Sequence, residues 1–525
     1  MLLPPKSLHP AGESNLPAKI EETELLEVDT FDGKLHVEWD PNASVTPIGQ
    51  LPFFIQYLKL GHRFLPWVED CPLAYYSNNA PGKIDVLGSL LLSVLSGHTR
   101  YAHITTLACD QVNPPLLGMN KVVSDDSARR ALLKIEEQAG VEWLQTHLQS
   151  CIEPLLQTPW ILDTDVTVKC LYGKQEGAEK GYNPKKPGRP SHTYHSYLIA
   201  NLRLVLEVEV QAGNLAQSKH SMPGLLSLLE RLPANGRPKF IRGDCDWGTE
   251  QVMGELEEKD YRYLFKLKKS KYVKQLIKKH HGQGQWEYFN NDFEVKEDYL
   301  QLMGWKDKRR VILVRRRLRT EHLVAIEHGT PKVAIGYEGA PKQMTLDFID
   351  DVEEIKAFEY AVLVTNLEDE IISILQHYRD RADCENYFDE IKNQWGWGGY
   401  TTKSLKSCRF IARIIALIYN WWTLYVRLCN PGNHKEAITS RPLLLSSVGR
   451  LVQSGRQKKM IVTSRHAQGN KVKKICQGLV HFFSELKSIA PQLTPKECWE
   501  RILVKAMAAF KMVVGSDPPV LALTG

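Results

Sequence analysis

The stretch YRDRADCENYFDEIK, residues 378–392, carries the pattern from which the fold of this chain is predicted. Arg381, Glu385 and Lys392 follow Tyr378 at offsets of three, seven and fourteen residues. On a continuous α-helix these four side chains project within about 60° of one another. A carboxylate suited to a metal cation then lies beside groups that bind phosphate oxygens. The alternative is a solvated helix face with ordinary ion pairs.

Charge is distributed unevenly along the 525 residues, although the net charge is only +6. From Thr401 onward there are 20 Lys+Arg against 5 Asp+Glu, whereas the first 400 residues contain 47 basic and 56 acidic residues. This asymmetry indicates that one part meets a polyanion and another binds cations. A solubilising bias of the surface is the alternative.

Cysteine use and hydropathy predict a reduced intracellular protein that does not enter a membrane. The ten cysteines include no CxxC pair, which argues against a disulfide scaffold or a zinc ribbon. The first residues, MLLPPKSLHP, lack the pattern of a signal peptide. The most apolar segment, residues 411–426, contains Arg413 and is too short for a confident span, so we expect a buried helix. A cytoplasmic location follows as the expectation.

Periodicity divides the chain into five parts. Residues 1–50 read as a loosely structured lead segment, and 51–155 as short helices, one of them capped by Ser124. These helices suit a helix-turn-helix-like DNA reader, although an ordinary packed helical domain fits equally well. Residues 156–269 and 359–400 alternate strands with helices and predict an α/β core with a mixed sheet. Residues 270–358 read as a β-rich insertion, and 401–525 as a basic, mostly helical C-terminal region.

Acidic side chains at two predicted strand ends complete a candidate metal site with Glu385. Asp163 and Asp165 lie in LDTDVT, and Asp244 and Asp246 lie in RGDCDWG. Phosphoryl-transfer sites with two divalent metals need carboxylates that converge from different elements. An acidic pair on an apolar strand is costly to bury without a cation or donors. The alternative is that each strand end simply emerges into water.

The chain resembles DDE-type insertion-sequence transposases, in the group-1 subfamily of DDE domains, over roughly residues 45–450. Tyr378, Arg381, Glu385 and Lys392 match every position of the Tyr-x2-Arg-x3-Glu-x6-Lys signature. Further similar stretches are LDTDVTV (162–168), the segment 173–198, YRDRADCENYFDEIKNQWG (378–396), GHTRYAHITTLACD (97–110) and VVSDDSARRAL (122–132).

The resemblance implies an RNase H-like α/β core with a β-rich insertion between the second and third acids. It assigns Asp165, in its Asp-x-Thr context, as the first catalytic and metal-binding acid, with Asp163 as the fallback. Asp244 before Trp247 fits the second acid, although Asp246 stands where relatives more often have a small residue. Glu385 is the third acid. Two Mg²⁺ ions, for which Mn²⁺ can substitute, are the implied cofactors.

The implied activity is cut-and-paste DNA transposition, in which element ends are cleaved and joined to target DNA. The signature residues Tyr378, Arg381 and Lys392 would contact DNA phosphates near the cleaved end. The basic loop 173–195 adds Lys185, Lys186 and Arg189 as candidate DNA ligands. A homodimer on double-stranded DNA, associated with the nucleoid, is the expected assembly. A nuclease that cuts without joining and an inactive transposase-derived DNA-binding protein are the alternatives.

Two other patterns are weighed and left open or set aside. Trp395 and Trp397 follow the signature helix and would suit stacking on an unpaired base, although core packing is favoured for at least one of them. His192 and His195 have ligand-like spacing but lie in a basic loop, so no zinc site is predicted.

Overall fold

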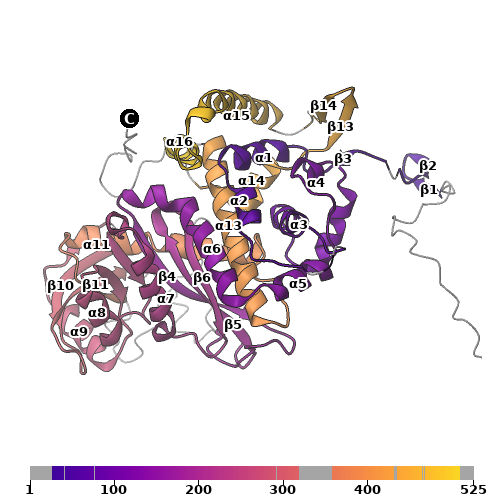
Figure 1. Cartoon of the computed structure of the whole chain (residues 1–525). Helices are drawn as coiled ribbons and strands as arrows, with labels where there is room; N and C mark the ends of the chain where they lie inside the picture. Colours follow the sequence, from indigo (N-terminus) through magenta and orange to yellow (C-terminus); the bar gives the residue numbers. More distant parts are fainter. Residues whose placement is uncertain are drawn as a thin grey trace, which may run out of the picture.

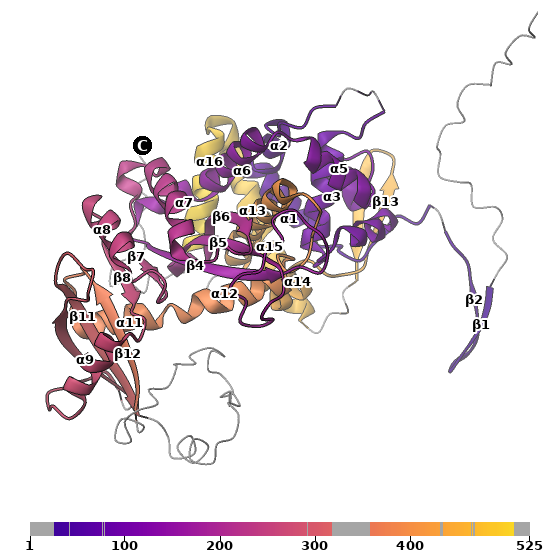
Figure 2. The same cartoon turned by 90° about the horizontal axis from the view of Figure 1, so that it is seen from below.

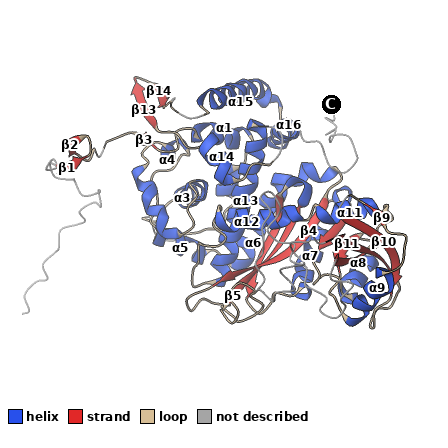
Figure 3. Cartoon of the chain, turned by 180° about the vertical axis from the view of Figure 1, so that it is seen from behind, coloured by secondary structure: helices blue, strands red, loops and turns tan. Residues whose placement is uncertain are grey.

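A large mixed sheet and a helical body lie side by side, and one long helix runs between them (Figure 1). The computed structural model describes residues 26–40, 42–75, 77, 79–290, 292–317, 358–430, 434–463, 465 and 468–508. Viewed from behind, the strands of the sheet gather on one side of the molecule and most helices on the other (Figure 3).

The sheet has nine strands in the described residues, in the order β6-β5-β4-β7-β8-β12-β11-β10-β9. Their bounds are β4 Ile161–Cys170, β5 Ser191–Ile199, β6 Leu204–Ala212, β7 Phe240–Gly243, β8 Tyr263–Lys266, β9 Glu287–Tyr288, β10 Phe293–Leu300, β11 Arg309–Arg317 and β12 Phe358–Thr365. β4, β5 and β6 form an antiparallel meander, whereas β7 and β8 run parallel to β4. The parallel strands are reached through the helices α7 (Ser218–Arg231) and α8 (Glu250–Glu258), as parallel pairing requires.

This order and these directions form an RNase H-like core, so the predicted α/β fold class with a mixed sheet is confirmed. β12 pairs antiparallel with β8, and β11, β10 and β9 continue outward from β12 in the same sheet. Helix α9 (Lys271–His281) begins at the N-cap Ser270, whose side chain accepts a hydrogen bond from the Val273 N–H. Because β12 pairs with β8 and the other added strands pair in turn with β12, the strands after α9 extend the core sheet.

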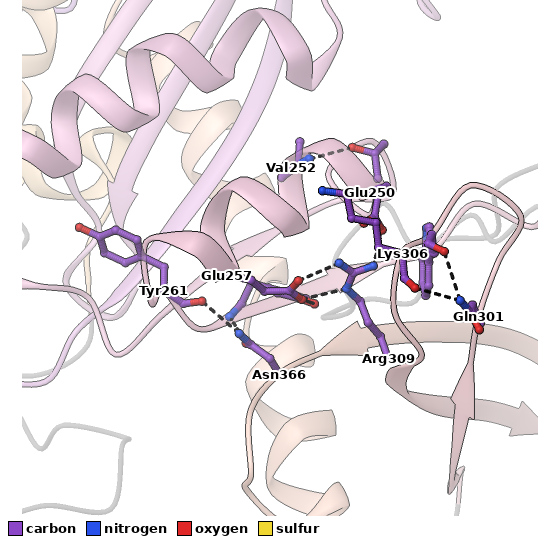
Figure 4. A network of polar contacts seen from close by, with 11 residues as sticks. Glu250, Val252, Glu257, Tyr261, Gln301, Lys306, Arg309 and Asn366 are labelled. Carbon is purple, nitrogen blue, oxygen red and sulfur yellow. Dashed lines mark hydrogen bonds and ion pairs between the residues drawn. The ribbon is translucent and has the colours of Figure 1, made fainter.

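Arg309 joins this extension to the core (Figure 4). Its Nε and Nη2 bind the two carboxylate oxygens of Glu257 on α8, at 2.8 and 2.7 Å, and its Nη1 binds Glu250. The Arg309 side chain is 5% exposed, so these charge-assisted bonds lie in a largely dry setting. Asn366, after β12, adds a bond from its Nδ2 to the Tyr261 carbonyl at 3.1 Å.

The helical body contains α1 to α6 before the sheet and α14 to α16 after it. The bounds are α1 Leu51–Leu60, α2 Phe64–Glu69, α3 Lys83–Leu95, α4 Asn113–Leu116, α5 Asp125–Lys134, α6 Glu137–Ile152, α14 Ala437–Leu444, α15 Gly469–Ile489 and α16 Pro495–Met507. The predicted N-cap is confirmed, because the Ser124 side chain accepts a hydrogen bond from the Ser127 N–H at the start of α5.

Helix α13 (Leu405–Cys429) is the predicted buried helix, and it packs against β6 and α6 as well as α16. Its few polar side chains are used to hold the sheet. Asn420 binds both the N–H and the C=O of Val205 at 2.8 Å, and Arg413 Nε binds Glu207 Oε1 at 2.8 Å. These bonds satisfy edge groups of β6 that would otherwise stay unpaired. No helix in the described part of the chain is long and apolar enough to span a membrane.

The signature segment is not one continuous helix, which corrects the expectation for residues 378–392. Helix α11 (Ile371–Arg379) ends before Asp380, and α12 (Ala382–Asn393) begins after Arg381. Two short-range bonds, from Arg381 N–H to Tyr378 O and from Cys384 N–H to Arg381 O, tighten the chain at the junction. Tyr378 therefore lies at the end of one helix and Glu385 and Lys392 on the next.

Two small sheets lie outside the core. β1 (Leu26–Thr30) and β2 (Gly33–Val37) form a hairpin within the predicted lead segment. β13 (Gly449–Ser454) and β14 (Gln457–Val462) form a second hairpin, whose first strand pairs with β3 (Val45–Thr46). The region after residue 401, expected to be mostly helical, thus also contains strands.

Candidate active site

One face of β4 presents Asp163, Asp165 and Thr167, because alternate residues of a strand point to the same side. Each of the three binds a different basic side chain. Two of these partners, Arg381 and Lys392, come from the signature segment. The strand and the signature helices are thereby joined along this face.

Asp163 is committed to a buried ion pair. Arg242, its register partner on the neighbouring strand β7, places Nε 2.5 Å from Oδ1 and Nη2 2.7 Å from Oδ2. Both side chains are 1% exposed. Such a pair satisfies both carboxylate oxygens and holds β4 against β7.

Asp165 lies two residues further along β4 and is half-buried. Arg381 Nη2 binds its Oδ2 at 2.6 Å, and the Val166 N–H binds its Oδ1 at 2.7 Å. Burial raises the pKa of Asp165 to about 6; Arg381 opposes this rise, and the negative charge of Asp244 adds to it. The two carboxylates are thus close enough to repel one another.

Asp244 lies two residues after Arg242, where the chain turns at the end of β7. Its Oδ1 accepts a bond from the Asp246 N–H at 2.9 Å, and its carbonyl accepts one from the Trp247 N–H at 3.2 Å. Gly243 is required at this turn, because a Cβ there would lie 2.7 Å from the buried Trp247 ring. The turn holds Asp244 just beyond the end of β7. Because Asp163 pairs with Arg242 in the β4–β7 register, Asp244 lies beside Asp165 of the adjacent parallel strand.

Asp246, the second acid of this turn, is occupied by protein partners. Its carboxylate binds the Ser218 N–H and Lys268 Nζ, each at 2.6 Å. Burial opposes its ionisation, but the bonds from Lys268 and Ser218 prevail and lower its pKa below the usual value. Asp246 therefore ties the start of α7 to the turn.

Glu385, on α12, is half-buried and lies within electrostatic reach of Asp165. Burial raises its pKa, Arg381 opposes the rise, and the charge of Asp165 adds to it. Lys266, at the end of β8, stabilises the ionised form. The three predicted acids thus come from β4, the β7 turn and α12, as a converging site requires.

Arg381 and Lys392 hold α12 against β4. Lys392 Nζ binds Thr167 Oγ1 at 2.6 Å. Burial, and after it the positive charge of Lys185, lower the pKa of Lys392 to about 8. Tyr378 packs on the apolar cluster beneath α11, and burial raises the pKa of its phenol. The predicted phosphate ligands therefore make contacts within the protein in this state.

The basic loop reaches this site from β4. Lys185, Lys186 and Arg189 are all exposed. The Lys186 ammonium and the Arg189 guanidinium lie 5.1 and 4.9 Å from the ring centre of Tyr172, which is 67% exposed. Because Lys185 acts on the pKa of Lys392, the loop and α12 share one electropositive rim.

From the sequence, no role was assigned to Arg242 or Tyr172, both of which contact predicted site residues. Arg242 stands directly before Gly243 and Asp244 of the second acidic segment, and a buried acid at Asp163 needs such a partner.

Trp395 and Trp397 are 0% and 2% exposed, and their ring N–H groups bind Glu390 and the Ala412 carbonyl. Stacking on an unpaired base is therefore wrong for both tryptophans.

The donor set suits a hard divalent cation, since three carboxylates that repel one another gain from a shared positive charge. Among the described residues, however, no group of three or more His, Cys, Asp or Glu side chains is drawn together as a metal site. The Arg381 guanidinium instead supplies the positive charge beside Asp165.

Comparisons with known proteins agree with the class that this fold and these acids indicate, the DDE-type transposases. The profile of the family described as transposase DDE domain group 1 matches residues 80–482, and the chain belongs to that family. No curated protein matches the sequence significantly. Among solved structures, similarity was found to the piggyBac transposase synaptic complex with hairpin DNA, determined by cryo-electron microscopy. The TM-score is 0.38 at 11% identity, over 87% of this chain and 86% of that one.

Proposed function

We propose that this transposase binds the terminal inverted repeats of its own insertion sequence and moves it by cut-and-paste DNA cleavage and strand transfer. The observation that carries the proposal is that Asp165, in the middle of β4, lies near Asp244, just beyond the end of the adjacent parallel strand β7, and near Glu385 on α12. Carboxylates from neighbouring strands, beside a helix that carries an acid and a basic side chain, suit phosphodiester chemistry.

Asp165, Asp244 and Glu385 are the proposed catalytic residues and would hold two Mg²⁺ ions, with Mn²⁺ as a substitute. When bound, these ions polarise the scissile phosphate and activate first water and then a DNA 3′-hydroxyl. The protein keeps the three acids in place through the β7 turn, the β4–β7 pairing and the packing of α12. Arg381 binds Asp165 in the structure, and its planar guanidinium would suit a DNA phosphate if Asp165 held a cation instead.

DNA is held by Tyr378, Arg381 and Lys392 beside the cleaved end, and by Lys185, Lys186 and Arg189 along the backbone. Lys185, Lys186 and Arg189 are exposed on a loop that can adjust to the duplex, and Lys185 lies within electrostatic reach of Lys392. We further propose that the protein acts as a homodimer on element ends and target DNA, in the cytoplasm and associated with the nucleoid.

The test compares wild type with Glu385→Gln, which removes the charge and keeps the shape, on element-end DNA with Mg²⁺ and then Mn²⁺. Asp389→Asn is the matched control, because Asp389 lies one turn further along α12, is exposed and accepts a hydrogen bond from Asn393. Cleaved and joined products from wild type and Asp389→Asn, with a loss of at least about a hundredfold in Glu385→Gln, are expected.

Other outcomes separate the alternatives. Cleavage without joined products would replace the proposal with a nuclease on the same fold. Specific binding with neither reaction in wild type would identify an inactive DNA-binding derivative. Equal activity of wild type and Glu385→Gln would remove Glu385 from the site.

A further inference from the structure

The hairpin β1–β2 is amphipathic, and its apolar face is uncovered. In its register, Leu26, Val28, Leu35 and Val37 share one face, and Glu27, Asp29, Lys34 and His36 share the other. Leu26, Val28 and Leu35 are 47%, 42% and 53% exposed. A lone two-stranded hairpin is marginal in water, so an ordered one with a bare apolar face requires a surface to cover it.

A second bare face lies on the sheet β14-β13-β3, which joins two strands from the C-terminal region to β3, shortly after the hairpin in the sequence. Arg450 pairs with Val45 on one side and with Ile461 on the other, and Val452 pairs with Lys459, so these five side chains share a face. Val45 and Ile461 are 41% and 42% exposed. This face, which we term the C-terminal sheet face, therefore presents β-branched side chains between two cations.

The two surfaces carry opposite charge. Residues 26–40 contain five acidic residues and one lysine. Residues 449–459 contain four basic residues, all exposed, and no acid. In the described part of the chain none of these four basic side chains takes part in an ion pair: Arg450, Arg456, Lys458 and Lys459. Glu27 and Asp29 lie on the opposite hairpin face, whereas Asp32, in the turn, and Glu38 and Asp40, after β2, lie at the margins of the apolar face. Complementary charge at the margins of matching apolar faces favours mutual docking.

We propose that the hairpin β1–β2 of one chain docks on the C-terminal sheet face of a second copy, and that the exchange is reciprocal. Figures 1 and 2 both place the hairpin apart from the body of its own chain, at the end of an extended connection. Exchange of one element between identical chains gives two equal contacts around a two-fold axis. The apolar side chains distinguish this occupant from DNA, which would use the cations alone.

Association is measured on the full-length protein without DNA, by light scattering after size-exclusion chromatography over a concentration series. Wild type is expected to reach twice the mass of one chain. Leu35→Asp and Ile461→Asp should each remain at one chain mass where wild type is dimeric. His36→Asp is the matched control, because it adds the same charge at the neighbouring position on the opposite hairpin face, and it should stay dimeric.

Mixing the two defective chains tests the exchange itself. A Leu35→Asp chain keeps its C-terminal sheet face and an Ile461→Asp chain keeps its hairpin, so the mixture retains one intact contact. Mixed dimers should appear, detected by a tag on one chain, although neither variant dimerises alone. Because no DNA is present, this result does not depend on the catalytic proposal.

Three results would overturn the inference. One is a wild-type protein that stays monomeric throughout the series. Another is a dimer that both aspartate variants leave unchanged. The third is a monomer whose DNA affinity falls on Arg450→Ala and Lys459→Ala, which would assign the C-terminal sheet face to DNA.

Discussion

Asp163 and Asp165 differ in chemistry although they lie two positions apart on one face of β4. Asp163 is matched by Arg242 through two bonds, whereas Asp165 faces another acid and has a raised pKa of about 6. A carboxyl whose pKa rises on folding is stabilised in its neutral form, so its charge at neutral pH costs stability. The first residue thus supports the fold, and the second stores unfavourable charge at the candidate site.

This contrast predicts unequal effects of two isosteric substitutions on the free energy of unfolding. Asp163→Asn leaves Arg242 buried without a counter-charge and should lower the free energy of unfolding by about 3–5 kcal/mol. Asp165→Asn removes the repulsion with Asp244 but also the charge partner of Arg381, so it should lower that free energy by less than Asp163→Asn does. Urea denaturation followed by circular dichroism measures both. Equal losses in the two variants would contradict the assignment.

Lys392 predicts how DNA binding depends on pH. Its pKa of about 8 means that the free protein loses this positive charge as pH rises through about 8. Affinity for element-end DNA should therefore fall by up to about tenfold between pH 7 and pH 9. Lys392→Arg keeps its charge and should remove this part of the fall. Lys186→Arg, on the exposed loop, is the control that should leave the profile unchanged.

At the scale of elements, the sequence predicted those features that neighbouring residues determine, such as a helix cap and a buried helix. The Ser124 cap and the buried helix over 411–426 follow from short-range pattern, and both are confirmed. The break between α11 and α12 does not, because no Gly or Pro marks Asp380 or Arg381. At this break Arg381 binds Asp165, which lies 216 positions away in the sequence, so only tertiary packing brings the two residues together.

Core packing was favoured from the sequence for at least one of Trp395 and Trp397, and the structure buries both. Their environment comes from α13 and from Glu390, not from neighbouring residues alone. The acidic residues were easier to find from the sequence. A carboxylate on an apolar strand is costly to bury unless a metal ion or a charged side chain binds it, so its presence indicates such a partner. The sequence could not distinguish the role of Asp163 from that of Asp165 until Arg242 was placed.

The ion pairs of Arg309 with Glu257 and Glu250 predict how much the contact between the added strands and α8 contributes to the free energy of unfolding. Arg309→Met leaves Glu257 and Glu250 without their shared cation and should lower the free energy of unfolding by about 2–4 kcal/mol. Lys308→Met, next to it but exposed, should change that free energy by less than about 0.5 kcal/mol. Thermal and urea unfolding provide the comparison, and equal effects of the two variants would exclude this role of the network.

At the scale of the whole molecule, the basic rim predicts how strongly DNA binding depends on salt. Replacing Lys185, Lys186 and Arg189 by Ala should reduce the slope of log affinity against log salt by about 2–3, since each phosphate contact contributes about 0.9. Replacing the exposed Lys59, Lys487 and Lys496 by Ala removes the same charge elsewhere and should leave the slope within about 0.5 of wild type. Fluorescence anisotropy between low and physiological salt measures both.

Helix α13 has a consequence for the order in which the protein is made. β6 and the helices α1 to α6 emerge from the ribosome early, yet the helix that packs against β6 and α6 ends only at Cys429. Until that point the nascent chain exposes apolar surface and is open to chaperones and to aggregation. A polypeptide interrupted before residue 429 therefore has no completed core around its acidic residues, and a truncated product is released without a formed site.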